Sequence, residues 1–123
     1  MDLHCVHELL TSLSAFNSDQ VKVRAFVAVD GNNQLYLTDD FESYKRKERI
    51  IVEAGDWIVQ GLYEHFSPYG GGPCLYFDSA EAIGTIVLVD DEMRFTQITE
   101  CMVRRDGVPL QFKDGRVSVC PEQ

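Results

Sequence analysis

Residues 20–37 read QVKVRAFVAVDGNNQLYL, and this stretch decides the fold class. Within residues 20–29, valine or alanine stands at every odd position and alternates with residues that include lysine and arginine. This period of two is typical of a strand with one buried face. Residues 30–33 are Asp-Gly-Asn-Asn, which tolerate the positive φ angles of a hairpin turn. Residues 35–37 then supply a returning strand, so the sequence predicts a β-hairpin here.

The residues before this hairpin follow the period of a helix. Apolar side chains recur at spacings of three and four, which places them on one stripe. Asp2 is a suitable N-cap for such a helix. We predict an amphipathic helix over residues 2–16, packed against a sheet or across one end of a barrel. The stripe consists of Leu3, Val6, Leu10, Leu13 and Phe16.

The rest of the chain alternates short apolar segments with turn signals. Residues 39–49 are highly charged and predict an exposed loop or a single helical turn. Residues 56–66 predict a helix with Asp56 as its cap, although Gly61 lowers the helix propensity of this segment. Residues 67–73 combine two prolines with three glycines and must be irregular. Asp-Gly pairs at the turns farther along indicate a β-meander. We expect strands over residues 50–52, 74–77, 82–89, 95–105, 108–112 and 117–120.

Together these elements predict a mostly β, α+β chain that forms a single domain over residues 1–123. A small barrel of the oligonucleotide/oligosaccharide-binding (OB) type fits their order, because the helix over residues 56–66 would lie between the third and fourth strands. The alternative is an open or bent antiparallel sheet with the N-terminal helix against it.

The composition limits the possible partners. The chain has 20 Asp and Glu against 11 Lys and Arg, a formal net charge of -9. Nucleic-acid binding through the whole surface is therefore disfavoured, because phosphate contacts need concentrated positive charge. The N-terminal residues lack the basic and apolar regions of a signal peptide. No run approaches the roughly 20 apolar residues that cross a bilayer. We expect a cytoplasmic protein without a membrane partner, and the composition leaves its oligomeric state open.

Motifs for catalysis or metal binding do not stand out. The glycines at 70–72 are not followed by the lysine and hydroxyl residue of a phosphate-binding loop. The four cysteines form no C-x-x-C pair, and we interpret them as small apolar side chains. His4 and His7 could share a helix face, but nothing specifies further metal ligands. We therefore expect a protein that is not an enzyme and that holds no metal and no cofactor.

The candidate partner-binding residues belong to three segments. They are a first acidic cluster within residues 39–42, a glycine-rich loop with its flanking tyrosines over residues 69–76, and a second acidic cluster over residues 90–92. Negative charge steers a protein toward a basic partner, and exposed tyrosines offer large contact area at low entropy cost. The simpler interpretation is that the carboxylates are solvated turn residues and that the loop is a tight crossover between helix and strand. The candidates are Asp39, Asp40, Glu42, Tyr69, Gly70, Gly71, Gly72, Tyr76, Asp90, Asp91 and Glu92.

One basic run supports an alternative. Residues 44–49 hold four of the 11 cations beside aromatic residues, as single-strand binders do. Acidic residues flank the run, so a charge-balanced loop is the simpler interpretation. The candidate nucleic-acid contacts are Tyr44, Lys45, Arg46, Lys47 and Arg49.

The order of elements also carries a resemblance. The early strand over residues 21–27, the strand over residues 35–37 and the stretch Tyr-Gly-Gly-Gly-Pro-Cys-Leu-Tyr over residues 69–76 resemble an uncharacterised group of small bacterial OB-like proteins, over most of residues 3–112. The resemblance implies an accessory or immunity role and no catalytic residue.

Three hypotheses follow from the sequence. The first is a non-catalytic, immunity- or antitoxin-like inhibitor of a basic protein, since toxins that cleave nucleic acid carry positive charge. The second is an OB-type module that binds single-stranded nucleic acid or a nucleotide. The third is a small-molecule enzyme or carrier with a pocket under residues 65–77.

Overall fold

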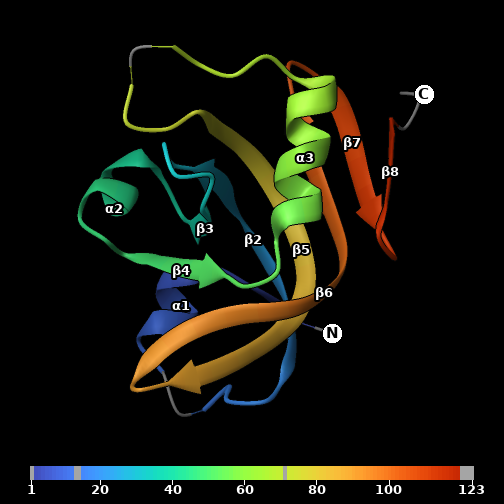
Figure 1. Ribbon diagram of the computed structural model, residues 1–123. Coiled ribbons are helices and arrows are strands. Elements are labelled where there is room, and N and C mark those ends of the chain that lie inside the picture. Colours follow the sequence, from blue (N-terminus) through green and yellow to red (C-terminus); the bar gives the residue numbers. More distant parts are fainter. Residues whose placement is uncertain (1, 13–14, 71, 120–123) are drawn as a thin grey trace.

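A computed structural model describes residues 2–12, 15–70 and 72–119 (Figure 1). Within these ranges the chain forms eight strands and three short helices. Their bounds, in chain order, are β1 Leu3–His4, α1 Val6–Leu10, β2 Gln20–Val29, β3 Leu35–Thr38, α2 Phe41–Lys45, β4 Arg49–Val52, α3 Asp56–His65, β5 Tyr76–Val89, β6 Glu92–Arg105, β7 Val108–Lys113 and β8 Arg116–Val119.

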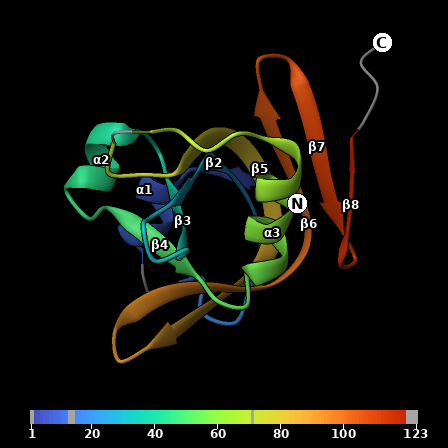
Figure 2. The ribbon, with the colours of Figure 1, turned by 45° about the horizontal axis from the view of Figure 1, so that its top comes forward.

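Five of the strands close into a barrel. Strand β2 pairs with β3, β3 with β4, β4 with β6, β6 with β5, and β5 again with β2. Only the β4–β6 pair in this ring is parallel. Figure 2 looks into the ring that these strands form. Helix α3 connects the third barrel strand, β4, to the fourth, β5. The predicted OB-type barrel is confirmed, and the open sheet is wrong.

The barrel core is built by the alternation that the sequence shows. On β2, Val21, Val23, Ala25 and Val27 are buried, while Lys22 and Arg24 between them face outward. Ile58 and Leu62 of α3 are fully buried against the same core. Burial of each such side chain contributes about 1.5–3 kcal/mol. The strand alternation and the helix stripe therefore meet in one core.

Strands β7 and β8 extend beyond the barrel and cover α3. Phe112 of β7 packs against Trp57 with ring centres 5.7 Å apart. A Cβ atom at Gly61 would lie 2.5 Å from Cε1 of Phe112 and 2.9 Å from Cγ2 of Val117. The glycine that weakens the helix prediction is the residue that lets the β7–β8 hairpin approach α3.

Among the described residues of the predicted N-terminal helix, only residues 6–10 are helical. Leu3 and His4 pair in parallel with β2 instead, so Asp2 caps no helix there. The Asp39 carboxylate accepts hydrogen bonds from the backbone N–H groups of Val6 and His7, at 2.7 and 2.8 Å, and fixes the helix start. Leu13 of the predicted stripe lies outside the described residues.

Other boundaries also differ from the sequence prediction. The two strands expected over residues 74–77 and 82–89 are one strand, β5, which begins at Tyr76. The polar pair Asp78-Ser79 does not interrupt it, because Asp78 has an ion-pair partner on β6. Helix α3 has Gly55 rather than Asp56 at its N-cap. In the ranges that the structure covers, all helices are too short and too polar to cross a membrane.

Candidate functional site

The glycine-rich loop is closed at its base. The backbone N–H of Tyr69 donates to the carbonyl of Leu75 at 2.7 Å, and the N–H of Leu75 donates to the carbonyl of Val29 at 2.7 Å. A Cβ atom at Gly70 or Gly72 would meet nothing within 4 Å, so neither glycine is required by close packing. Gly71 lies outside the described residues. Gly70 and Gly72 therefore face open space above a fixed base.

A buried ion pair holds that base in place. Nε and Nη2 of Arg105 donate to the two carboxylate oxygens of Asp78, at 2.7 and 2.9 Å, and Nη1 donates to the carbonyl of Ser67 at 2.6 Å. The Asp78 side chain is only 2% exposed. The guanidinium also lies 4.2 Å from the ring centre of Tyr69 and 5.6 Å from that of Tyr76. The Arg105 side chain thus contacts Ser67, Tyr69 and Tyr76, which belong to the segment where the sequence predicts a small-molecule pocket.

The two tyrosines of the predicted loop site differ in exposure. Tyr69 is exposed and remains available on the surface. Tyr76 is 0% exposed and donates its hydroxyl to the carbonyl of Phe66 at 2.9 Å. Burial raises the pKa of the Tyr76 phenol. The prediction that Tyr76 contacts a partner is therefore corrected, because its ring belongs to the core.

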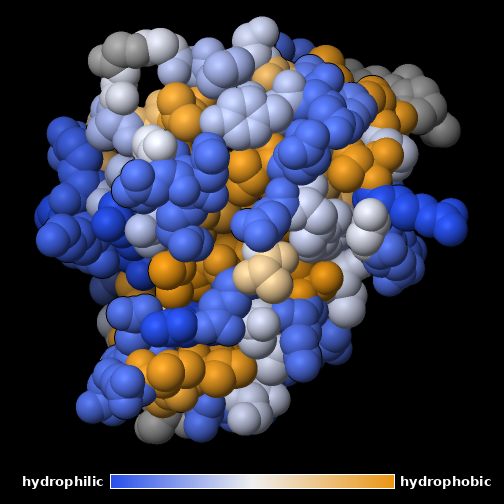
Figure 3. All heavy atoms as spheres, in the orientation of Figure 1, coloured by the Kyte–Doolittle hydropathy of each residue, from blue (hydrophilic) through white to orange (hydrophobic). Residues whose placement is uncertain are grey.

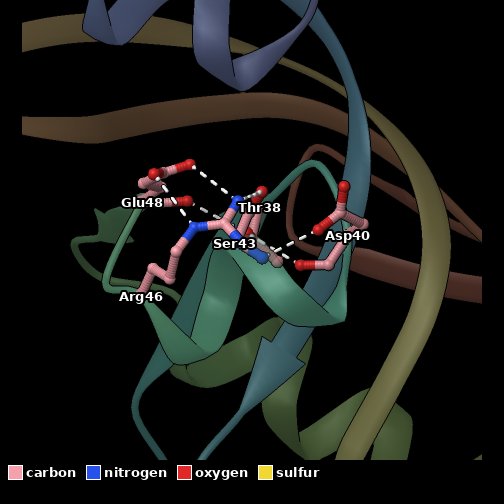
Figure 4. A network of polar contacts seen from close by, with 5 residues as sticks. All are labelled: Thr38, Asp40, Ser43, Arg46 and Glu48. Carbon is pink, nitrogen blue, oxygen red and sulfur yellow. Dashed lines mark hydrogen bonds and ion pairs between the residues drawn. The ribbon is translucent and has the colours of Figure 1, made fainter.

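The first acidic cluster is largely occupied by helix capping. Asp39 accepts from the first N–H groups of α1. Asp40 accepts from the N–H of Ser43 at 2.7 Å and caps α2 (Figure 4), and this hydrogen bond lowers the pKa of Asp40. Glu42 is exposed and forms an ion pair with Lys45 at 3.1 Å. Of the three carboxylates, Glu42 has no capping role.

The basic run folds into α2 and the turn after it. Arg46 pairs with Glu48, from Nε to Oε1 at 3.2 Å, which raises the pKa of Arg46 (Figure 4). Tyr44 is buried, and burial raises its pKa to about 12. Arg49 lies over the ring of Tyr44 at 4.6 Å, whereas Lys47 is exposed. Carboxylates in the same segment thus neutralise part of this run.

The second acidic cluster lies far from the first. Asp90 and Asp91 form the tight β5–β6 turn with φ angles of 51° and 63°, and Glu92 begins β6. All three are exposed. Figure 1 shows this turn at the bottom of the view, whereas α2 lies at mid-height on the left. The structure brings the loop and α2 together, through Cys74 and Tyr44, but not the two acidic clusters.

The second cluster joins two carboxylates that the sequence does not single out. Arg94 of β6 donates to Glu53 at 2.6 Å, and its Nε lies 3.4 Å from Glu92. The hydrogen bond to Glu53 and the negative charge of Glu92 and Asp90 raise the pKa of Arg94. A cleft of about 210 Å³ beside it is lined by Asp56 among others. We call Glu53, Asp56, Asp90, Asp91 and Glu92 the acidic face.

The position of the acidic face follows from the barrel topology. Ile51 of β4 pairs with Arg94 of β6, which brings the end of β4 beside the start of β6. Figure 3 shows a band of hydrophilic side chains between these strands, flanked by apolar patches. The parallel β4–β6 pairing places Glu53 and Asp56 near residues 90–92. No local pattern of the sequence predicts this pairing, so the sequence alone does not show that these carboxylates share one face.

The N-terminal histidines have other contacts. Nδ1 of His4 lies 2.9 Å from the Glu8 carboxylate, and the His4 ring packs against Phe16 with centres 5.0 Å apart. Within residues 2–12, 15–70 and 72–119, no three His, Cys, Asp or Glu side chains are grouped to hold a metal ion.

Fold and surface together define a small OB-type barrel with a segregated acidic face. Comparison of the chain with protein-family models, with curated proteins and with solved structures gives no match. The resemblance to small bacterial OB-like proteins therefore stays a prediction.

Proposed function

We propose that this protein is a non-catalytic binding protein whose acidic face docks on a cationic surface of another protein. In its specific form, the proposal is that it inhibits a nucleic-acid-cleaving toxin in the manner of an immunity or antitoxin protein. The cationic surface of such a toxin serves its polyanionic substrate, so an acidic inhibitor can cover the same surface.

The segregation of charge on the barrel supports this proposal. Three carboxylates of the acidic face, Glu53, Asp90 and Glu92, interact with Arg94, and Asp56 lines the cleft beside it. The ion pairs of Arg94 with Glu53 and Glu92 leave the face with an excess of negative charge. Both carboxylates remain exposed, unlike Asp78 or the capping Asp39.

The location of the face supports the same proposal. OB-type barrels bind oligonucleotides and oligosaccharides on the outer face of their second and third strands and on the neighbouring loops. In this chain those strands are β3 and β4, and the acidic face continues from the end of β4 to the β5–β6 turn. A nucleic acid placed on the acidic face itself would meet like charge, whereas a basic protein would meet opposite charge.

The experiment is capture of partners from the native host, or from a lysate that also contains the product of the neighbouring gene, at low and high salt. The test variant carries Asp90→Asn, Asp91→Asn and Glu92→Gln. Asparagine tolerates the left-handed backbone of the turn, so the fold should be unaffected. We expect the wild type to retain a basic protein at low salt and to release it at high salt, and the variant to lose it.

A charge-matched control separates the acidic face from net charge. The control carries Asp2→Asn, Asp106→Asn and Asp114→Asn, three exposed carboxylates elsewhere. It should retain the partner, with an association rate close to that of the wild type, whereas the face variant should associate about tenfold more slowly. Equal losses in both variants, or retention of neutral and acidic proteins alone, would contradict the proposal.

A further inference from the structure

A chain of aromatic rings crosses the outside of the barrel and reaches within two strands of the acidic face, because Tyr36 pairs with Ile51 and Ile51 pairs with Arg94. Phe26 of β2 stacks on Phe77 of β5, with ring centres 4.8 Å apart and planes within 10°. Phe41 of α2 meets Phe77 edge-on at 5.4 Å and Tyr44 at 6.4 Å. Tyr36 of β3 meets Tyr44 at 6.0 Å. Five rings from three strands and one helix are thus in continuous contact.

One of these rings is structural and four reach the surface. Tyr44 is buried in a small second core with Ala28 and Cys74, where it holds α2 against the barrel. Phe26, Tyr36 and Phe77 are half-buried, and Phe41 is exposed. Docking of α2 therefore accounts for Tyr44, but it leaves the other rings partly open to solvent.

Cations lie at both ends of this chain of rings. At one end, Arg49 lies 4.3 Å from the ring centre of Tyr36, and near the middle Lys45 lies 5.4 Å from that of Phe41. At the other end, Arg24 precedes Phe26 by two residues on the same outward face of β2, and its side chain is 69% exposed. Both ends of the chain of rings therefore carry positive charge.

Two more cations continue the β2 end. Arg104 of β6 faces outward and pairs with Ser79, the β5 residue opposite Phe26. Lys22 lies farther along β2. We call the rings and cations together the aromatic–cationic strip: Lys22, Arg24, Phe26, Tyr36, Phe41, Tyr44, Lys45, Arg49, Phe77 and Arg104.

The strip differs in charge from the rest of the molecule. Four carboxylates, Asp30, Glu42, Glu81 and Glu100, lie near its five cations and its rings, whereas the whole chain has 11 cations to 20 carboxylates. Glu81 lies 3.7 Å from Lys22 and 3.6 Å from Arg24. Exposed pairs of this kind are weak, so a phosphate can displace them.

We propose that the aromatic–cationic strip binds single-stranded nucleic acid, with bases against the exposed rings and phosphates at Arg24, Arg104 and Arg49. Single-strand binders combine stacking platforms with positive charge along the backbone. A duplex cannot offer its base faces to these rings. An acidic peptide would use the cations but not the rings. The strip lies outside the acidic face, so this site is additional to the proposed function.

The test is a fluorescence-anisotropy titration of the full chain against labelled oligo-dT at low salt. We expect a dissociation constant in the micromolar range, rising with salt as counterions are released. Arg24→Glu with Arg104→Glu should weaken binding at least about tenfold. The charge-matched control is Lys113→Glu with Arg116→Glu on the exposed β7–β8 hairpin, which should stay within about twofold of the wild type.

Further variants and competitors separate stacking from charge. Phe41→Ala leaves every charge in place and should weaken binding, while Phe41→Leu keeps the apolar packing of α2 and should weaken it equally. Circular dichroism and the melting temperature verify that each variant is folded. If the variant with Arg24→Glu and Arg104→Glu does not fold, the variant with Arg24→Gln and Arg104→Gln is measured in its place. The proposal is overturned by no binding at about 100 μM protein. It is also overturned by equal losses in test and control pairs, or by equal affinity for duplex DNA or poly-glutamate.

Discussion

Two arginines on β6 show how one kind of ion pair serves two purposes. Arg105 and Arg94 each donate to a carboxylate on another part of the chain, at 2.7 Å to Asp78 and at 2.6 Å to Glu53. The Arg105 and Asp78 side chains are 13% and 2% exposed, whereas Arg94 and Glu53 are 33% and 39% exposed. Chemistry and distance are nearly equal, and burial is what differs.

This difference decides which charges remain for a partner. A buried carboxylate needs a partner, because an unpaired charge in the interior is costly. Arg105 supplies that partner and also fixes Ser67 and the base of the glycine-rich loop. The exposed pair of Arg94 contributes little to folding, since water and salt screen it. Arg105 therefore belongs to the fold, while Arg94 and its carboxylates belong to the surface.

Replacement of the two arginines should give the largest contrast. Arg105→Ala leaves Asp78 buried without its ion pair and should lower the free energy of unfolding by about 3 kcal/mol. Arg94→Ala should leave the free energy of unfolding nearly unchanged, because its pair is exposed. Urea denaturation followed by tryptophan fluorescence measures both.

A double variant sharpens this contrast. Arg105→Leu with Asp78→Leu removes both charges at once and should be more stable than Arg105→Ala, because no buried charge is left unpaired. Equal destabilisation by Arg105→Ala and Arg94→Ala would show that burial does not distinguish the two pairs.

Loss of one buried hydroxyl at the Arg105 end should have a smaller effect. Tyr76→Phe removes the hydrogen bond to the Phe66 carbonyl and should lower the free energy of unfolding by about 1 kcal/mol. The matched control is Tyr63→Phe, whose exposed hydroxyl donates to Asn33 at 2.8 Å and can be replaced by water. The same denaturation curves test both, and a loss in Tyr63→Phe as large as in Tyr76→Phe would refute the role assigned to burial.

Local sequence patterns predict much of the fold, and long-range pairs explain where they fail. The β2–β3 hairpin and the Asp-Gly turns depend on neighbouring residues, and the structure confirms them. The helix expected over residues 2–16 is shortened because Asp39, distant in the sequence, caps it at Val6. Strand β5 continues through Asp78 because Arg105 neutralises it. A short segment of sequence around Val6 does not include Asp39, and one around Asp78 does not include Arg105, so local patterns cannot predict these contacts.

The candidate site follows the same rule. The sequence shows that Asp39, Asp40 and Asp90 are acidic, but not that Asp39 and Asp40 cap helices while Asp90 faces solvent. Composition predicts a negative surface, and only the parallel β4–β6 pairing places Glu53 beside Glu92. The sequence gives the number of carboxylates, but it does not show which of them cap helices and which face solvent.

Alkaline pH should give the smallest effect, again at the Arg105 end. Burial raises the pKa of Tyr76, although the Arg105 charge opposes this, and burial raises the pKa of Tyr44 to about 12. Unfolded tyrosines lose their protons near about pH 10. Above that pH the unfolded chain binds fewer protons than the folded chain, so the free energy of unfolding falls as pH rises.

The slope of this decline distinguishes Tyr76 from the other groups. Urea denaturation between about pH 8 and pH 10.5 should show a shallower decline for Tyr76→Phe than for the wild type, because one phenol with a raised pKa is gone. The buried Cys101 thiol, whose pKa burial raises to about 12, contributes equally to both curves. Parallel curves for Tyr76→Phe and the wild type would mean that the Tyr76 hydroxyl titrates alike in the folded and unfolded chain. The ring beside Arg105 would then be as open to water as the side chains around Arg94.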